Sequence, residues 1–100
     1  ETVADMSHNH LPPGLCVRFP DAPVHPGRVF GLGSAVLDNP GPLDPPTAAG
    51  EVSWGGMAGT MWWINPRLGT AGVLMTQRYL GFGNAYTVAF KQLAYQGLAA

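Results

Sequence analysis

The chain has 100 residues, of which 46% are hydrophobic and only 11% are charged, and its formal net charge is −1. Ordinary soluble domains carry about 25% charged residues, so we expect part of this surface to be covered by further protein, either a longer parent chain or a tight oligomer. The five basic residues are scattered, which argues against a nucleic-acid partner. The longest apolar run is far too short to span a membrane, and the sequence leaves open a cytoplasmic or a periplasmic location.

The first half of the chain predicts one short helix and one strand. Val3, Met6 and His10 fall near one face of a helix over residues 1–9. Residues 10–28 are rich in proline and glycine and are expected to form a loop. Residues 29–37 then predict a strand in which Gly31 and Gly33 allow close contact. Residues 38–50 are again proline- and glycine-rich, and too long for a tight hairpin turn.

Two further strands are predicted, over residues 51–64 and 70–77. The Asn-Pro and Gly of the turn 65–69 make them antiparallel neighbours. Gly55, Gly56 and Gly59 are unexpected inside residues 51–64, because glycine weakens the interior of a strand. We interpret these glycines as a place where a ligand or another backbone approaches closely.

Adjacent tryptophans indicate how this sheet is covered. Trp62 and Trp63 must point to opposite faces of their strand, so both faces need a cover. After a loop at 81–84, Asn84 is a good N-cap for a helix over residues 84–98. Its predicted apolar face, which covers one side of the sheet, consists of Tyr86, Phe90, Leu93 and Gly97. The prediction is an α+β fold with an antiparallel sheet and a C-terminal helix, whose second cover is missing.

Few residues suggest chemistry by themselves. Cys16 is the only cysteine, which excludes an internal disulfide and predicts a small, buried or half-buried apolar residue. His8 and His10 form a His-x-His pair that could share a metal, but exposed loop histidines are the simpler interpretation. Ser7 lies next to His8, but sequence neighbours on a helix do not face each other. The pairs "GLG" and "GFG" lack the full phosphate-binding fingerprint.

The string "VSWGGMAGTMWWINP…GTAGVLMTQ" resembles the C-terminal part of the serine β-lactamase-like hydrolases, and most of all the family VIII carboxylesterases related to class C β-lactamases. In that branch Trp-Gly-Gly, here Trp54-Gly55-Gly56, stands in place of the Lys-Thr-Gly box. The resemblance extends in order over nearly the whole chain. It implies that residues 1–100 are a C-terminal segment of the α/β domain of the β-lactamase/transpeptidase-like fold.

The resemblance also implies roles for the motif. The acyl part of a small ester would lie along this strand, with Gly55 and Gly56 permitting close approach. Met57 would present its backbone N–H to the oxyanion hole, a donor that can be worth about 3 kcal/mol in the transition state. Trp54 would wall the acyl pocket, although a plain core aromatic is the alternative interpretation. No metal or organic cofactor is implied.

The sequence departs from the family in one decisive respect. The nucleophile and base of these enzymes lie in Ser-x-x-Lys, and a tyrosine motif such as Tyr-x-Asn assists them. The single lysine, Lys91, is preceded three places earlier by Val88, and no tyrosine is followed two places on by Asn. This chain is therefore expected to be inactive alone and to need a second polypeptide segment, as the product of a split gene, cleavage or truncation.

Several functions stay open on the sequence. The parent reaction is expected to be hydrolysis of a small carboxylic ester through an acyl-enzyme. A β-lactamase, a D-aminopeptidase or a transacylase would use the same site. A different class is a non-catalytic remnant, or a binding module that holds a partner through its glycine-rich edge.

Overall fold

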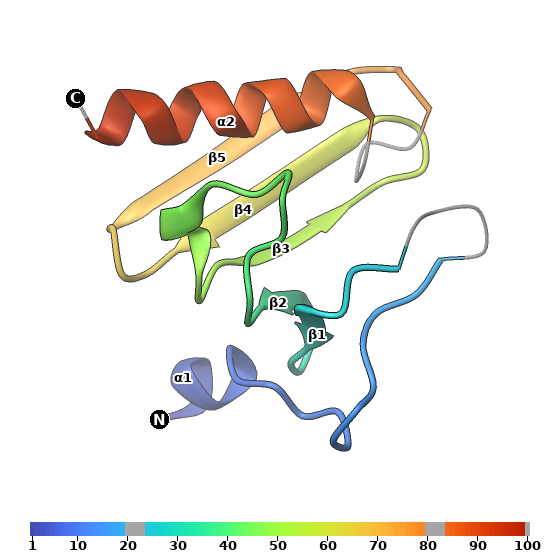
Figure 1. Cartoon of the computed structure of the whole chain (residues 1–100), viewed down its shortest axis with the longest axis vertical. Coiled ribbons are helices and arrows are strands. Elements are labelled where there is room, and N and C mark those ends of the chain that lie inside the picture. Colours follow the sequence, from blue (N-terminus) through green and yellow to red (C-terminus); the bar gives the residue numbers. More distant parts are fainter. Residues whose placement is uncertain (20–23, 80–83, 100) are drawn as a thin grey trace.

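Five short strands form a single antiparallel sheet, and a long helix packs on one of its faces (Figure 1). The structure is a computed structural model that describes residues 1–19, 24–79 and 84–99. The strands lie in sequence order, β1-β2-β3-β4-β5, so each is paired with its neighbour in the chain. The predicted α+β class, with an antiparallel sheet and a C-terminal helix, is confirmed. The elements are α1 (Thr2–Met6), β1 (Arg28–Phe30), β2 (Ala35–Leu37), the 3₁₀ helix η1 (Pro46–Ala48), β3 (Val52–Gly55), β4 (Thr60–Asn65), β5 (Thr70–Met75) and α2 (Ala85–Ala99).

Two of the three predicted strands are in fact hairpins. Residues 29–37 divide into β1 and β2, and residues 51–64 divide into β3 and β4. The dividing turns contain Gly33 and Gly59, whose φ angles of +127° and +123° are conformations that other residues rarely adopt. The prediction that Gly56 and Gly59 lie inside one strand was therefore wrong. These glycines form the turn that reverses the chain.

The main core lies between the sheet and α2. Trp63 is 2% exposed, and its ring lies 5.5 Å from Phe90 and 6.0 Å from Tyr95, both on α2. Opposite Trp63 in the ladder stands Gly72, where an added Cβ would lie only 2.2 Å from the indole ring. The missing side chain of Gly72 thus leaves the space that the Trp63 ring occupies. Met61 and Leu37 complete the buried cluster on this face.

Helix α2 buries a different stripe from the one predicted. Asn84 caps it as expected, since its side-chain oxygen accepts the N–H groups of residues 86 and 87 at 2.9 and 3.0 Å. Of the predicted face, Phe90 packs against the core, but Tyr86, Leu93 and Gly97 are exposed. The fully buried positions are Thr87, Lys91 and Tyr95. Apolar spacing misplaced this face because the polar groups of Lys91 and Tyr95 find buried partners in Glu51 and Asn65.

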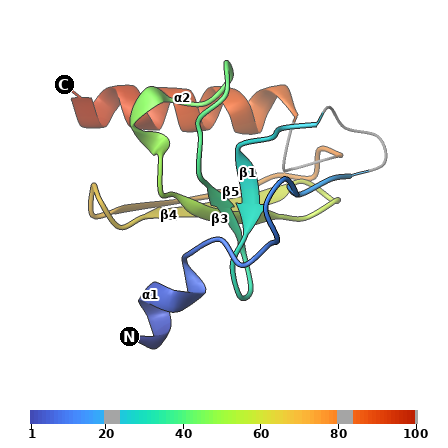
Figure 2. The same cartoon turned by 60° about the horizontal axis from the view of Figure 1, so that its bottom comes forward.

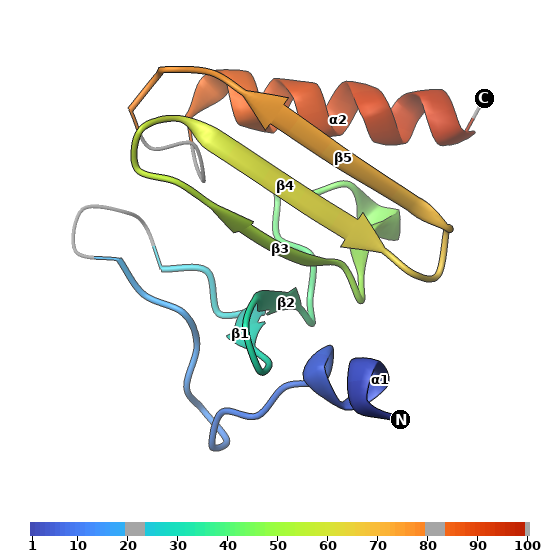
Figure 3. The same ribbon diagram turned by 180° about the vertical axis from the view of Figure 1, so that it is seen from behind.

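The opposite face of the sheet is only partly covered. As predicted, Trp62 points away from Trp63, and it packs with Val36 and Val52 in a second, smaller cluster. Further along this face Val73 is 64% exposed, and Ile64 is exposed as well. Figure 2 shows α2 on one side of the sheet and α1 on the other, and Figure 3 looks onto the face that lacks α2.

The segments outside the sheet match the loop predictions where the structure describes them. Residues 10–19 and 24–27 contain no helix or strand. The predicted hairpin turn 65–69 joins β4 to β5, with Gly69 at φ +65°. Gly31 does approach another backbone closely, because a Cβ there would lie 2.0 Å from the Met6 carbonyl oxygen. Helix α1 buries no side chain.

The "GFG" of residues 81–83 lies outside the described residues. Among the helices of the described ranges, none combines the length and the apolar character needed to cross a membrane.

Candidate functional site

Within the described residues, strand β3 has an edge next to the Trp-Gly-Gly motif that pairs with no other strand. It pairs with β4 along its whole length, from Val52 to Gly55. Its ladder with β2 contains only Val52 and Ser53 and stops before Trp54. The Gly56 N–H donates to the Thr60 carbonyl of β4 at 2.8 Å. Since backbone groups alternate along a strand, those of Gly55 face away from β4, toward the side on which β2 has ended.

Trp54 stands at the beginning of this open edge and is half-buried. Its ring makes an edge contact with Phe30 at 5.6 Å and a tilted contact with Phe19 at 5.7 Å. Aromatic pairs in such geometries add about 0.5–1.5 kcal/mol beyond the burial of their surface. Trp54 therefore has packing partners of its own and still presents part of its surface to solvent.

The turn that follows the motif is tightly held. The Gly59 N–H donates to the Gly56 carbonyl at 3.1 Å, and the Thr76 hydroxyl donates to the Gly59 carbonyl at 2.6 Å. An added Cβ on Gly59 would lie 2.5 Å from the backbone of Arg78. The close approach that the sequence indicated is thus met at Gly59 by the chain's own backbone. Gly56 has less room than expected too, since its Cβ would lie 2.6 Å from the Thr60 hydroxyl.

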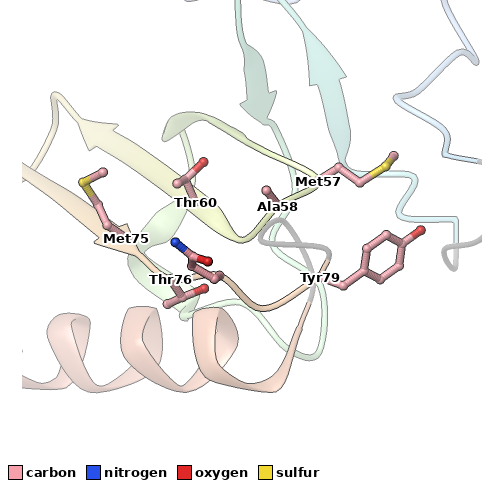
Figure 4. Close-up of a pocket in the computed structure, with 7 residues that line it drawn as sticks. Met57, Ala58, Thr60, Met75, Thr76 and Tyr79 are labelled. Carbon is pink, nitrogen blue, oxygen red and sulfur yellow. The ribbon is translucent and has the colours of Figure 1, made fainter.

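A hollow of about 600 Å³ opens between this turn and the end of β5 (Figure 4). Met57, at the tip of the turn, is 67% exposed and forms part of its wall. In Figure 4 Met57 and Tyr79 lie on one side of the view and Met75 on the other. The hollow therefore begins at the residue whose N–H the family resemblance assigns to the oxyanion hole. Its lining residues are Met57, Ala58, Thr60, Met75, Thr76, Gln77 and Tyr79.

A buried polar network lies just before β3, and the sequence analysis missed it. Glu51 is 0% exposed; Lys91 Nζ donates to its Oε1 at 2.7 Å, and the Tyr95 hydroxyl donates to its Oε2 at 2.7 Å. Asn65 in turn donates to the Tyr95 hydroxyl at 3.0 Å. Burial, reinforced by the neighbouring Glu51 carboxylate, raises the pKa of Tyr95 well above its ordinary value, although the Asn65 hydrogen bond opposes the shift. The network fastens α2 to the residue that precedes β3.

A second polar cluster joins two loops. His25 and Arg28 pair with the carboxylate of Asp44, which also accepts the Gly41 N–H at 2.8 Å. Burial raises the pKa of Asp44, but the hydrogen bonds from His25 and Gly41, with the nearby cationic charges, outweigh it, so the net pKa is lowered. The other ring nitrogen of His25 accepts the Gly27 N–H at 3.2 Å. Both nitrogens of His25 are thus engaged, which leaves neither of them to serve as a general base or a metal ligand.

The remaining candidates stay apart from the motif. A ring nitrogen of His8 is hydrogen-bonded to the Ala4 carbonyl oxygen, and one of His10 to the Asp5 carbonyl oxygen. Within the described ranges no three metal-ligating side chains lie together. Ser7 donates to the Val3 carbonyl at 3.0 Å. Cys16 is a free, half-buried cysteine, as predicted.

Within the described residues no serine hydroxyl forms a hydrogen bond with a histidine ring, and Ser53 is a buried residue of β3. The only lysine is engaged by Glu51. The motif residues Trp54, Gly55, Gly56 and Met57 therefore form a strand end and turn without a nucleophile beside them in the described part of the chain.

Comparison with known proteins gives one related sequence. No protein-family model matches the chain. Esterase EstB from Burkholderia gladioli is 38% identical over 71 residues. The matched part is 70% of this chain and 18% of the esterase, so the chain spans less than a fifth of the length of this relative.

Proposed function

We propose that this chain forms the substrate-edge segment of a serine hydrolase. The chain is a partial homologue of a family VIII, β-lactamase-like esterase, as its motifs predicted. The reaction is the hydrolysis of a small carboxylic ester through an acyl-enzyme. The observation that carries the proposal is the open backbone edge at Gly55, where the ladder with β2 has stopped after Ser53. An extended acyl group lies along this edge and meets backbone groups that no strand of the described residues pairs with.

Met57 supplies the oxyanion contact in this proposal. It is the first residue of the turn after Gly56, and it is exposed at the rim of the hollow. A preorganised N–H at this place stabilises the negative charge that develops on the carbonyl oxygen, by about 3 kcal/mol for one donor. Trp54 forms the wall beside the acyl group, held in position by its contact with Phe30.

The nucleophile and its base come from a second polypeptide segment that carries Ser-x-x-Lys. The sheet face that bears Val73 and Ile64 supports this part of the proposal, because both side chains are exposed there while the α2 face is packed. A segment of the same hydrolase domain that covers these apolar side chains gains about 25 cal/mol for each Å² removed from water. The missing cover and the missing nucleophile thus have one common source.

Reconstitution tests the proposal. The chain alone, the Ser-x-x-Lys segment of a family VIII esterase alone, and the two mixed are assayed with a short-chain nitrophenyl ester and a fluorophosphonate label. We expect turnover and labelling only in the mixture, with the label on the serine of the second segment. Labelling of this chain at Ser7, Ser34 or Ser53 would show that the mechanism is wrong. A mixture that forms a complex and yet neither turns over nor labels would instead favour a non-catalytic binding role.

A further inference from the structure

The hollow beyond Met57 lies past the motif rather than along it. It is bounded by the β3–β4 turn on one side and by the end of β5 on the other (Figure 4). Thr60 and Met75 are directly paired in the β4–β5 ladder, so their side chains share one face of the sheet. Trp54 does not line the hollow and contacts Phe30 of β1 instead. The hollow is therefore a separate space from the one that Trp54 borders.

The described residues that line the hollow are apolar in their larger side chains and carry no charge. Met75 is 77% exposed, and Met57 and Tyr79 also present much of their surface. The Thr76 hydroxyl is already engaged, because it donates to the Gly59 carbonyl and accepts the Arg78 N–H at 3.2 Å. Methionine side chains adapt to apolar groups of different shape. Such a lining suits a neutral, flexible alkyl group, and its polar groups, on Thr60, Gln77 and Tyr79, are uncharged.

We propose that this hollow binds the alcohol portion of the ester substrate and that Met75 is a specificity-determining residue. The inference rests on the proposed function. With the acyl group along Trp54-Gly55-Gly56 and the carbonyl oxygen at the Met57 N–H, the group on the other side of the carbonyl continues past Met57 into the hollow. A volume of about 600 Å³ lies within the range of roughly 300–1,000 Å³ that is usual for small-molecule sites. The substrate class is thus an ester of a small, neutral alcohol.

The chain contains its own reporters for a binding experiment. Of its four methionines, Met57 and Met75 line the hollow, Met61 is buried in the α2 core, and Met6 lies in α1. The chain, labelled with ¹³C at the methionine methyl groups, is titrated with 1-butanol and followed by NMR. We expect the methyl signals of Met57 and Met75 to shift and saturate together, while those of Met6 and Met61 stay in place. Sodium butyrate, with the same number of carbons and a charge, should shift them much less.

A matched pair of variants completes the test. Met75→Thr should raise the 1-butanol concentration at half-maximal shift of Met57 about fourfold, as expected for the loss of roughly one buried CH₂. Val73→Thr, on the same strand and face but outside the lining of the hollow, should leave this 1-butanol concentration unchanged. The proposal is overturned if the four methyl groups shift alike or not at all, if butyrate acts as well as butanol, or if both variants behave alike. These readouts use the chain alone, so their failure is distinct from a failure of the reconstituted esterase.

Discussion

Replacement of Lys91 by methionine should strongly destabilise the fold, although the side chain keeps its apolar length. In the native chain Lys91 Nζ lies 2.7 Å from Glu51 Oε1, and the two side chains are 7% and 0% exposed. The variant leaves a fully buried carboxylate whose remaining side-chain donor, within the described residues, is the Tyr95 hydroxyl. Removal of one partner from a buried ion pair costs about 3–5 kcal/mol, a large share of the roughly 5–15 kcal/mol by which a domain is stable.

Urea unfolding followed by tryptophan fluorescence measures this loss. A thermal melt should show a midpoint lowered by about 12 °C or more, since 1 kcal/mol shifts a domain of this size by about 4–8 °C. Gln96→Met, at an exposed position of the same helix, is the matched control and should change little. The double variant Glu51→Gln/Lys91→Met removes both charges and leaves Tyr95 an amide oxygen to donate to.

The double variant decides whether the pair is coupled. We expect it to be more stable than the sum of the two single losses predicts, by about 1–3 kcal/mol. Additive losses in the cycle, or a Lys91→Met variant that unfolds within about 1 kcal/mol of the wild type, would refute the reasoning, because they would mean that the Glu51 carboxylate is solvated rather than held dry by the helix.

Three further predictions concern the core, acid stability and the motif. Gly72→Ala should lower the unfolding free energy by about 1–3 kcal/mol, because the added Cβ would meet the Trp63 ring. Gly97→Ala, where an added Cβ has nothing within 4 Å, should stabilise α2 by about 0.5–1 kcal/mol. Equal melting temperatures of the two variants would contradict the packing of Trp63 against Gly72. The pKa of Asp44 is lowered in the folded chain, so the ionised carboxylate stabilises the fold above the ordinary pKa of 3.8, and this stabilisation is lost as the pH falls through the folded pKa. Urea unfolding at pH 5 and pH 3 should therefore show a smaller loss of stability between the two pH values in Asp44→Asn than in the wild type. Gly56→Val should abolish ester hydrolysis in the reconstituted enzyme, because its side chain would clash with the Thr60 hydroxyl, 2.6 Å from an added Cβ, and displace the strand end beside the open edge; unchanged turnover in this variant would remove the close-approach argument.

Local patterns in the sequence were sufficient for several features of the fold. Side chains alternate along a strand, so Trp62 and Trp63 had to lie on opposite faces, and they do. Asn84 caps α2 because a short amide side chain can reach the first free N–H groups of a helix. The string "VSWGGMAGTMWWINP…GTAGVLMTQ" and the order of the segments around it indicated an esterase relative, and the chain is 38% identical to Esterase EstB over 71 residues.

Other features depend on groups that meet only in three dimensions. The glycines of residues 51–64 suggested a strand with an approached edge, but a positive φ angle and the nearness of Arg78 make Gly59 part of a turn. The pattern of apolar residues wrongly placed Tyr86, Leu93 and Gly97 against the sheet, because such a pattern assigns polar side chains to the solvent side of a helix.

Short-range periodicity and turn chemistry were sufficient to predict the antiparallel sheet, the C-terminal helix and the motif, because these features depend on residues that are close in the chain. The burial of Lys91 could not be predicted in this way, since its partner Glu51 lies 40 residues away in the chain and the cost of burying either charge depends on the other being in contact. The same holds for His25, whose partner Asp44 is 19 residues distant, and for the hollow beside Met57, which the β3–β4 turn and the end of β5 create.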